Sequence, residues 1–524
     1  MTFPPARRSP PRRLSASPPP ASVCRALTRL LAGLALALLP TCGDSAPPPD
    51  TRPDLLLVVV DTLRADHLST YGYARHTSPG LDALAQTGVV FEDNTAQSSW
   101  TLPSVASIMT GRHLFVNAQR LPDRCHSLAE RLRAAGYETV AFLGNPAVST
   151  SGAYDRGFDA FVGRETTGNV TWGAAELQAA VATWMAAHPR TDKPRFMYLQ
   201  FMDPHWPYAP KDPPPVDGDD VKLRDDTLTA WLTAVKAAGP GTPLYDTFDA
   251  DRKYILEQID LYDHEIATMD RGLAGILASL GPARPDGADA AGAQTAAVLP
   301  GTRGRLVIVA ADHGETLWEH KHYEKEVAKK VPPEQRTLRE VFWRDHSYHL
   351  YQELLHTPLI VAGTGFAPGQ RIGTPVENVD IVPTLLRAAG LPADPELEGR
   401  PLQDVVAGKG RPRPVLYSFC NEGTAVRLAD AGWKFMFPTA TGDDFGMIMQ
   451  LYDLRADPHE RVSHADGKNP ATRDVLQKLV KLREDAARAF HLYDDQKVQS
   501  DAPEQQNVLR ELGYIAGDEK PGAR

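Results

Sequence analysis

The sequence contains few cysteines. Its 524 residues include four, and Cys24 and Cys42 lie within the first 50 positions. Cys125 and Cys420 are therefore the only cysteines after that stretch. Two cysteines are too few for a scaffold that depends on disulfide bonds. We expect no essential disulfide bond in this protein.

Positive charge and long apolar runs are also scarce. Lys and Arg number 56 against 66 Asp and Glu, which gives a formal net charge of −10. A chain of this charge lacks the basic surface that binds nucleic acid, so we expect no nucleic-acid partner. The apolar run at 27–39 is too short to span a bilayer comfortably. Enzymes that carry several transmembrane helices are disfavoured for the same reason.

The first 42 residues have the pattern of a secretory signal. Four arginines between Arg7 and Arg13 precede the apolar run, whose length suits the hydrophobic core of a signal peptide. The following Leu39-Pro40-Thr41-Cys42-Gly43 resembles a bacterial lipoprotein signal, although Gly, Ala or Ser usually precedes that cysteine. We expect a periplasmic or outer-membrane protein of a bacterium, anchored through lipid on Cys42. The alternatives are cleavage to a free periplasmic protein and a retained anchor.

Four predominantly apolar segments predict buried strands of a parallel sheet, at 55–60, 139–143, 196–201 and 306–311, and the first of them is a continuous apolar run. Polar side chains follow each run: Asp61, Asn145, Asp203 with His205, and Asp312 with His313. Ligands gather at the carboxyl ends of strands in open α/β sheets, so these residues are candidates for a site. The alternative is that each is an ordinary turn or capping residue.

The stretch 98–112 predicts a helix whose start can hold an anion. Pro103 suits the first helical turn, and Gly111 is a natural end. Thr101 then lies at the helix N-terminus, where backbone N–H groups and the helix dipole favour negative charge. A hydroxyl beside such a position has what attack on a phosphate or sulfate ester requires. A buried helix capped by a threonine is the alternative.

This stretch resembles the nucleophile motif of the sulfatase family, within the alkaline phosphatase superfamily. The motif runs Cys/Ser-x-Pro-Ser-Arg, then an apolar stretch, then Thr-Gly-Arg. The matching residues are Thr101, Pro103, Ser104, Thr110, Gly111 and Arg112. Thr101 replaces the Cys or Ser that sulfatases oxidise to formylglycine, and Val105 replaces the Arg. Oxidation of a threonine would give a ketone, whereas phosphodiesterase members of the superfamily use an unmodified Thr.

Three further segments resemble the same family. Asp61 begins a motif in which sulfatases carry two Asp, and Thr62 stands at the second position. The segment 136–145 resembles a signature that normally ends in a sulfate-contacting Lys. It ends here in Asn145, and phosphodiesterase relatives use an Asn near this position to hold a non-bridging oxygen. Asp312-His313 resembles the Asp-Asn or Asp-His pair of calcium-dependent sulfatases and the Asp-His pair of Zn- or Mn-using phosphohydrolases.

The resemblance implies one divalent metal ion, Ca, Zn or Mn. Its ligand set would be Asp61, Thr101, Asp312 and His313. The spacing of Asp203 and His205 does not fit that of two-metal phosphodiesterases, so we expect one metal site in preference to two.

Two histidines are implied near the leaving group. His205 lies in a His-x-Pro-Tyr loop that resembles the family's substrate-binding loop, and Asp203 could orient it or bind metal. His346 matches a residue that faces the leaving group in relatives, with His320 and His349 as nearby alternates.

The resemblance covers about residues 54–491 and implies an α/β fold. We expect a large mixed, mostly parallel sheet flanked by helices on both faces, and a small C-terminal α+β subdomain with an antiparallel sheet. The expected divisions are a signal at 1–42, a linker at 43–53, a sulfatase-like catalytic domain at 54–399, a C-terminal subdomain at 400–495 and a polar tail at 496–524. We also expect a lid or insertion at 212–253, a flexible insertion at 281–304 and a solvated excursion at 321–344.

These features predict an exported, arylsulfatase-like hydrolase. It would use a metal and the Thr101 hydroxyl to cleave sulfate or phosphate esters, including diesters, of a small molecule, lipid or glycan. Two alternatives remain open. One is a transferase that moves a phospho head group onto an envelope lipid or glycan. The other is a catalytically inactive sulfatase-like protein that binds glycans.

Overall fold

A computed structural model describes the protein over residues 50–114, 120–163, 171–218, 221, 223–281, 304–321, 331–410, 413–420, 423–438, 448–466 and 469–490. The expected signal with Cys42, most of the insertion at 281–304 and the polar tail lie outside these residues. Within the described ranges, no helix combines the length and apolar character needed to cross a membrane.

An eight-stranded sheet forms the centre of the fold, in the order β11-β2-β10-β7-β1-β6-β4-β5. Its strands are β1 (Asp54–Val60), β2 (Gly88–Phe91), β4 (Glu138–Leu143), β5 (Ala160–Gly163), β6 (Arg195–Phe201), β7 (Arg305–Ala311), β10 (Leu359–Gly363) and β11 (Gln370–Ile372). β10 pairs antiparallel with β7 and β2, and the other pairings are parallel. The predicted mixed, mostly parallel sheet is confirmed.

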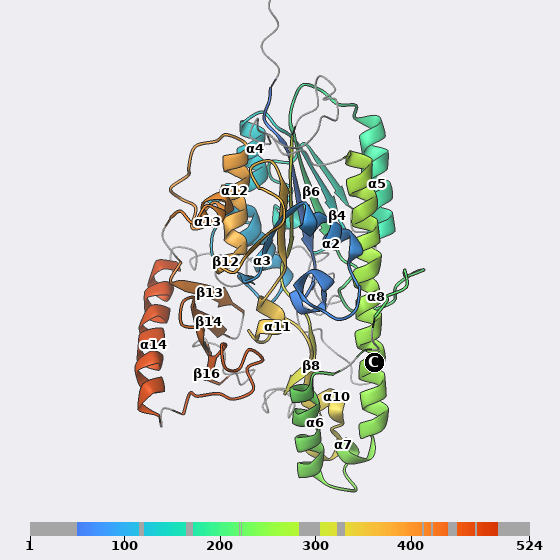
Figure 1. Ribbon diagram of the computed structural model, residues 1–524, viewed down its shortest axis with the longest axis vertical. Helices are drawn as coiled ribbons and strands as arrows, with labels where there is room; N and C mark the ends of the chain where they lie inside the picture. The colour runs from blue at the N-terminus through green and yellow to red at the C-terminus, as the bar shows by residue number, and fades with distance from the viewer. Residues whose placement is uncertain are drawn as a thin grey trace, which may run out of the picture. The chain divides into compact units, whose positions relative to one another are not determined.

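Helices cover both faces of this sheet (Figure 1). Because side chains alternate along a strand, Leu55, Leu57 and Val59 enter one core, and the residues between them enter the other. The first core contains side chains from α3 (Thr101–Thr110), α4 (Leu128–Ala134), α12 (Ile381–Ala388) and α13 (Leu402–Val406). The second contains side chains from α2 (Pro79–Gln86), α5 (Ala174–Ala187), α6 (Asp225–Ala238) and α8 (Phe248–Leu280). β1 is thus buried on both faces, as its apolar run predicts.

A four-stranded antiparallel sheet near the C-terminus confirms the predicted smaller sheet. It consists of β13 (Val415–Phe419), β14 (Gly423–Leu428), β15 (Trp433–Pro438) and β16 (Gln450–Asp453), and α14 (Pro470–Phe490) packs on it. Its first strand meets the chain that leads into α3: the Phe419 N–H donates to the Gln97 carbonyl at 2.8 Å, and the Ser418 hydroxyl donates to the Ala96 carbonyl at 2.6 Å.

The remaining α-helices and strands of the described residues are short. They are α7 (Pro243–Asp246), α10 (Leu338–Val341), α11 (Gln352–Leu355), the strand pair β3 (Asn94–Thr95) and β12 (Val376–Glu377), and the pair β8 (Thr316–Lys321) and β9 (Phe342–Asp345). The expectation of a solvated excursion at 321–344 is wrong for its last part. Leu338 and Phe342 are fully buried in the second core, because these two apolar side chains act as anchors within a charge-rich segment.

Candidate active site

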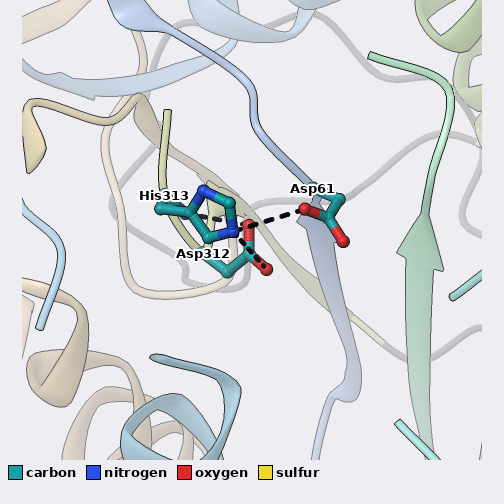
Figure 2. Close-up of side chains that lie close together, drawn as sticks. All are labelled: Asp61, Asp312 and His313. Atoms are coloured by element: carbon teal, nitrogen blue, oxygen red, sulfur yellow. Dashed lines mark hydrogen bonds and ion pairs between the residues drawn. The ribbon is translucent and has the colours of Figure 1, made fainter. Parts of the chain in front are cut away.

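The three candidate metal ligands follow two neighbouring strands. Val60 ends β1 and Ala311 ends β7, and these two residues are partners in the parallel register. Asp61 and Asp312 therefore leave the sheet side by side, and His313 follows directly. Their potential ligand atoms all lie within 4.8 Å of one another, and all three side chains are fully buried (Figure 2).

The charges of this trio fit a cation. Burial raises the pKa of the Asp61 carboxyl, and burial together with nearby Asp61 raises that of Asp312. Burial also lowers the pKa of His313 well below its ordinary value, so its ring is neutral. The His313 Nδ1–H donates to the Gly314 carbonyl at 2.8 Å, which leaves the Nε2 lone pair 3.5 Å from Asp61 Oδ1.

One ligand oxygen lacks a protein partner. Asp312 Oδ2 is buried and forms no hydrogen bond with the described residues. Buried polar atoms are normally paired, so a carboxylate oxygen without a hydrogen bond in this position fits a site that could hold an ion. Two carboxylates and a neutral imidazole are donors that suit a divalent metal, and the residues present therefore fit the metal that the sequence predicts.

The Thr101 hydroxyl lies against the same three side chains. Thr101 is the first residue of α3, and Trp100 before it is extended, with φ −155° and ψ 160°. Thr101 Oγ1 lies 3.3 Å and 3.2 Å from the two Asp61 carboxylate oxygens and 3.3 Å from His313 Nε2. One turn on, the Ser104 hydroxyl donates to the Asp312 carbonyl at 2.5 Å and ties α3 to the end of β7. The helix start thus directs its N-terminal dipole towards the buried acidic groups.

Asn145, after β4, contacts the Asp61 carboxylate. Its Nδ2 donates to Asp61 Oδ2 at 2.6 Å, and its Oδ1 accepts from the Ala147 N–H at 2.8 Å. The amide is therefore held at both ends, and it orients Asp61. Nδ2 carries a second N–H, which is the group that could donate to a bound oxyanion.

His205 and His346 complete one side of the site. Their ring centroids are 5.0 Å apart, and the His346 ring is 4.7 Å from that of His313. The His205 Nδ1–H donates to the Trp206 carbonyl at 2.5 Å, and His346 Nδ1 lies 3.2 Å from Glu315 Oε1. The predicted residues Asp61, Thr101, Asn145, His205, Asp312, His313 and His346 therefore lie in one buried cluster.

Three of the weaker candidates have other contacts. Asp203 Oδ1 accepts from the Ala174 N–H at 2.8 Å, at the start of α5, so it caps a helix. His320 Nδ1 lies 2.6 Å from Glu353 Oε1, and His349 Nε2 lies 2.9 Å from the Thr316 hydroxyl. The contacts of His320 and His349 indicate structural roles. His346, rather than His320 or His349, packs on the candidate metal ligands.

The sequence reasoning missed Glu315 and Arg64. Glu315 pairs with His346, and Arg64 is 1% exposed. Arg64 Nη1 donates to the Glu315 carbonyl at 3.0 Å and to Glu319 Oε1 at 2.5 Å, so it joins the loop after β1 to the loop after β7. Glu315 could have been noticed as the fourth residue of Asp-His-Gly-Glu. Nothing in the local sequence marks Arg64 as buried.

The chain is similar to known sulfatases over much of its length. Residues 53–285 match the family described as Sulfatase. The choline-sulfatase of Rhizobium meliloti (strain 1021) is 22% identical over 490 residues, which cover 82% of this chain and 86% of that protein. The arylsulfatase K of Gallus gallus is 29% identical over 188 residues, and this match spans 34% of this chain but only 30% of that longer relative.

Solved structures share the fold. A 2-O GAG sulfatase superposes with a TM-score of 0.59 at 20% identity, over 87% of this chain and 96% of the other. The phosphonate monoester hydrolase of Agrobacterium radiobacter superposes with a TM-score of 0.58 at 20% identity, over 83% of this chain and 96% of the other. The architecture that surrounds the buried site is thus found in hydrolases named for sulfate and for phosphonate esters.

Proposed function

We propose that this chain is a member of the sulfatase family, within the alkaline phosphatase superfamily, and that it hydrolyses sulfate or phosphate esters with the Thr101 hydroxyl as nucleophile. The family match and the relatives support the general activity, that of a hydrolase acting on ester bonds. The nucleophile and the substrate are the more specific parts of the proposal.

One observation carries the proposal. Thr101 Oγ1 lies within 3.3 Å of the Asp61 carboxylate and of His313 Nε2, in a fully buried site. A threonine that only capped its helix would direct its side chain to backbone N–H groups. Thr101 is the first residue of α3, after the N-cap position Trp100, and its hydroxyl is directed to the metal-ligand candidates.

Asp61, Asp312 and His313 would hold a divalent metal, with Thr101 Oγ1 beside them. Such an ion lowers the pKa of a nearby hydroxyl and neutralises charge on the ester. Thr101 Oγ1 gives up its proton to solvent and attacks phosphorus or sulfur, and the bond to the leaving oxygen breaks. The product is a threonyl phosphate or sulfate, which water cleaves in a second step to restore the hydroxyl.

The other side chains of the site stabilise charge during these steps. The second N–H of Asn145 Nδ2 and the backbone amides at the start of α3 would donate to the non-bridging oxygens of the transferring group. His346, with Glu315 at 3.2 Å, or His205 would give a proton to the leaving alkoxide. Both rings lie on the same side of the site, so the leaving group would face them.

The choice between sulfate and phosphate depends on two substitutions. Thr101 lacks the chemistry that makes formylglycine, and Asn145 replaces a lysine that would add positive charge. Both changes favour a phosphorus ester, whereas the relatives named choline-sulfatase and 2-O GAG sulfatase favour a sulfate ester, including that of a sulfated glycan. We therefore propose the hydrolysis of sulfate or phosphorus esters and test the two kinds of ester against each other.

The decisive experiment compares an aryl sulfate, an aryl phosphonate and a bis-aryl phosphate with purified protein. Wild type is measured with and without chelator, beside Thr101→Ala and the matched control Thr101→Ser, which keeps a hydroxyl. We expect Thr101→Ala to lower kcat by about 10³-fold or more and Thr101→Ser to keep most of the activity. Turnover that resists the chelator, or that survives Thr101→Ala, would remove the mechanism.

A further inference from the structure

A pocket of about 350 Å³ adjoins the candidate active site. Its walls come from the start of α5, the loop after β6 and the middle of α8, and His205 belongs to both the pocket and the site. His205 contacts His346, which in turn contacts His313. The pocket therefore begins on the side where the leaving group of the proposed reaction would lie.

Each of two carboxyl groups on the pocket wall has a hydrogen bond to only one of its oxygens among the described residues. Glu265 on α8 is 7% exposed, and its Oε1 accepts from the Ala209 N–H at 2.7 Å. Asp203 Oδ1 accepts from the Ala174 N–H, and Asp203 Oδ2 is buried with no hydrogen bond to any described residue. Neither carboxyl forms an ion pair within the described ranges. Each carboxyl thus has one oxygen that accepts a backbone hydrogen bond and a second oxygen that can accept one from a ligand.

Both carboxyls have a raised pKa, and in each case a second acidic group contributes to it. Burial raises the pKa of Asp203 to about 7, with a further contribution from Glu176. Burial raises the pKa of Glu265 to about 8, with a further contribution from Asp203. In an empty pocket both groups therefore hold protons at neutral pH for much of the time. A cationic ligand would favour their ionised forms.

The other charged groups on the pocket wall are exposed. Glu176, Lys211 and Arg271 are all solvent-accessible, and Arg271 Nη2 donates to the Asp212 carbonyl at 2.9 Å. Water and salt screen the charges of exposed groups far more than those of buried ones. The two positive side chains at the rim therefore do not cancel the effect of Glu265 and Asp203 on the inner wall.

Aromatic side chains add a second feature that suits a cation. Trp172 and Trp206 line the pocket and are half-buried. The Arg344 guanidinium lies 4.1 Å from the Trp206 ring centroid and covers one face of this ring, so a ligand cation would use Trp172 or the other face of Trp206. Aromatic faces combined with carboxylates are the side chains that recognise ammonium groups.

We propose that this pocket binds the alcohol part of the ester and selects an alcohol that carries an ammonium group, through Glu265 and Asp203. The inference rests on the proposed function, because it takes the pocket to be the leaving-group subsite of that active site. A neutral polyol is the competing ligand, since protonated carboxyls also form hydrogen bonds with hydroxyls.

The test measures binding, so that it does not depend on turnover. The probes are 4-amino-1-butanol and 1,4-butanediol, which have the same length and differ in one terminal group. Ligand-observed NMR titrations use the full-length protein and four variants. Glu265→Gln and Asp203→Asn keep the shape and the backbone hydrogen bonds but remove the charge. Glu257→Gln removes an exposed charge from the same helix as a control, and Thr101→Ala removes the proposed nucleophile.

We expect the amine to bind wild type at least about tenfold more tightly than the diol. Glu265→Gln and Asp203→Asn should each weaken amine binding by a similar factor, whereas Glu257→Gln and Thr101→Ala should leave it unchanged. Equal binding of amine and diol, amine binding that neither pocket variant changes, or no amine binding to the folded wild type would overturn the inference. Amine binding lost with Thr101→Ala would also overturn it, because the probe would then occupy the catalytic centre.

The result also separates this inference from the proposed function. If wild type binds the amine as expected but cleaves none of the three esters, the pocket assignment is supported and the proposed hydrolase activity fails. If the esters are cleaved and the amine does not bind, the proposed hydrolase activity is supported and the pocket assignment fails. A denaturation curve for each variant confirms that a loss of binding is not a loss of folding.

Discussion

His346 has contacts that fit a proton donor to the leaving group. Its ring packs on His313 and His205, and its Nδ1 lies 3.2 Å from Glu315 Oε1, which fixes the ring orientation. A donor in this position matters most when the departing alkoxide is a strong base, because a weak base leaves without a proton.

We therefore expect His346→Ala to slow the cleavage of alkyl esters by about 10²-fold and that of nitrophenyl esters by much less. The measurement is kcat/KM across esters whose leaving groups differ in pKa. His264→Ala, on the half-buried face of α8, serves as the control. An equal loss for every leaving group would show that His346 does not protonate the alkoxide.

At the residue scale, position relative to a strand decided which side chains could be predicted. Asp61 and Asp312 directly follow apolar runs, and the ends of parallel neighbours must meet, so their convergence follows from the sequence pattern. Arg64 could not be predicted in the same way. Its burial depends on Glu319 and on the Glu315 carbonyl, more than 250 residues away, and an isolated arginine usually reads as exposed.

At the scale of elements, the loop after β7 has no room for a side chain at Gly314. A Cβ there would lie 1.9 Å from the Glu353 carbonyl oxygen, and the Gly314 N–H donates to the Leu354 carbonyl at 2.8 Å. A substitution must therefore shift the backbone that carries His313.

We expect Gly314→Ala to lower the free energy of unfolding by about 1–3 kcal/mol and to weaken metal binding. Gly373→Ala is the matched control, because its Cβ would meet nothing closer than Glu92 Oε2 at 3.6 Å. Urea denaturation and a metal titration measure the two effects. Unchanged metal affinity in Gly314→Ala would mean that this loop tolerates movement without consequence for the site.

The end of α3 is fixed by a histidine with two acidic neighbours. His113 is 5% exposed, with Nε2 3.2 Å from Glu377 Oε1 and Nδ1 2.7 Å from Glu398 Oε2. Burial alone would lower the pKa of His113, but Glu377 and Glu398 outweigh it and raise this pKa to about 9. The protonated ring is therefore part of the folded state.

The contacts of His113 with Glu377 and Glu398 predict that the stability of the fold depends on pH. The pKa of His113 is higher in the folded chain than its ordinary value of 6.5, so its contribution is complete below pH 6.5 and is lost as the pH rises through about 9. We expect wild type to lose up to about 3 kcal/mol more than His113→Gln over that interval. Urea denaturation across the interval tests this, and parallel curves for the two proteins would contradict it.

Among the elements, long apolar strands were the easiest to predict. β1, β4, β6 and β7 are predominantly apolar because both of their faces are buried. β14 was not predicted, because Gly423-Thr-Ala-Val-Arg-Leu mixes polar and apolar residues without a clear period. Its place is set by pairing with β13 and β15. Pairing between strands is a tertiary interaction that local sequence does not encode.

At the scale of the whole molecule, the buried acidic pair should couple metal binding to stability. Asp61 and Asp312 destabilise the fold when no cation lies between them, since both charges are fully buried. A metal that binds the folded chain alone adds about 2.7 kcal/mol at a hundred times its Kd. The melting temperature should therefore rise with metal and fall with chelator.

Asp312→Asn provides the control for this effect. It removes one buried negative charge and keeps the oxygen that accepts the His313 N–H at 2.8 Å. We expect the metal-free variant to be at least as stable as metal-free wild type and to gain little from added metal. Calorimetric scans with and without Zn, Mn or Ca make the comparison. An equal metal-induced rise in both proteins would place the ion elsewhere.

The contact between β13 and the residues ahead of α3 has a consequence for biosynthesis. Ala96 and Gln97 emerge from the ribosome more than three hundred positions before Ser418 and Phe419, which hold them by hydrogen bonds. The residues that lead into α3 therefore gain these hydrogen bonds only when the last fifth of the chain is translated. A nascent polypeptide stalled before that point lacks these hydrogen bonds, so we expect the proposed activity to arise only after β13 has been translated.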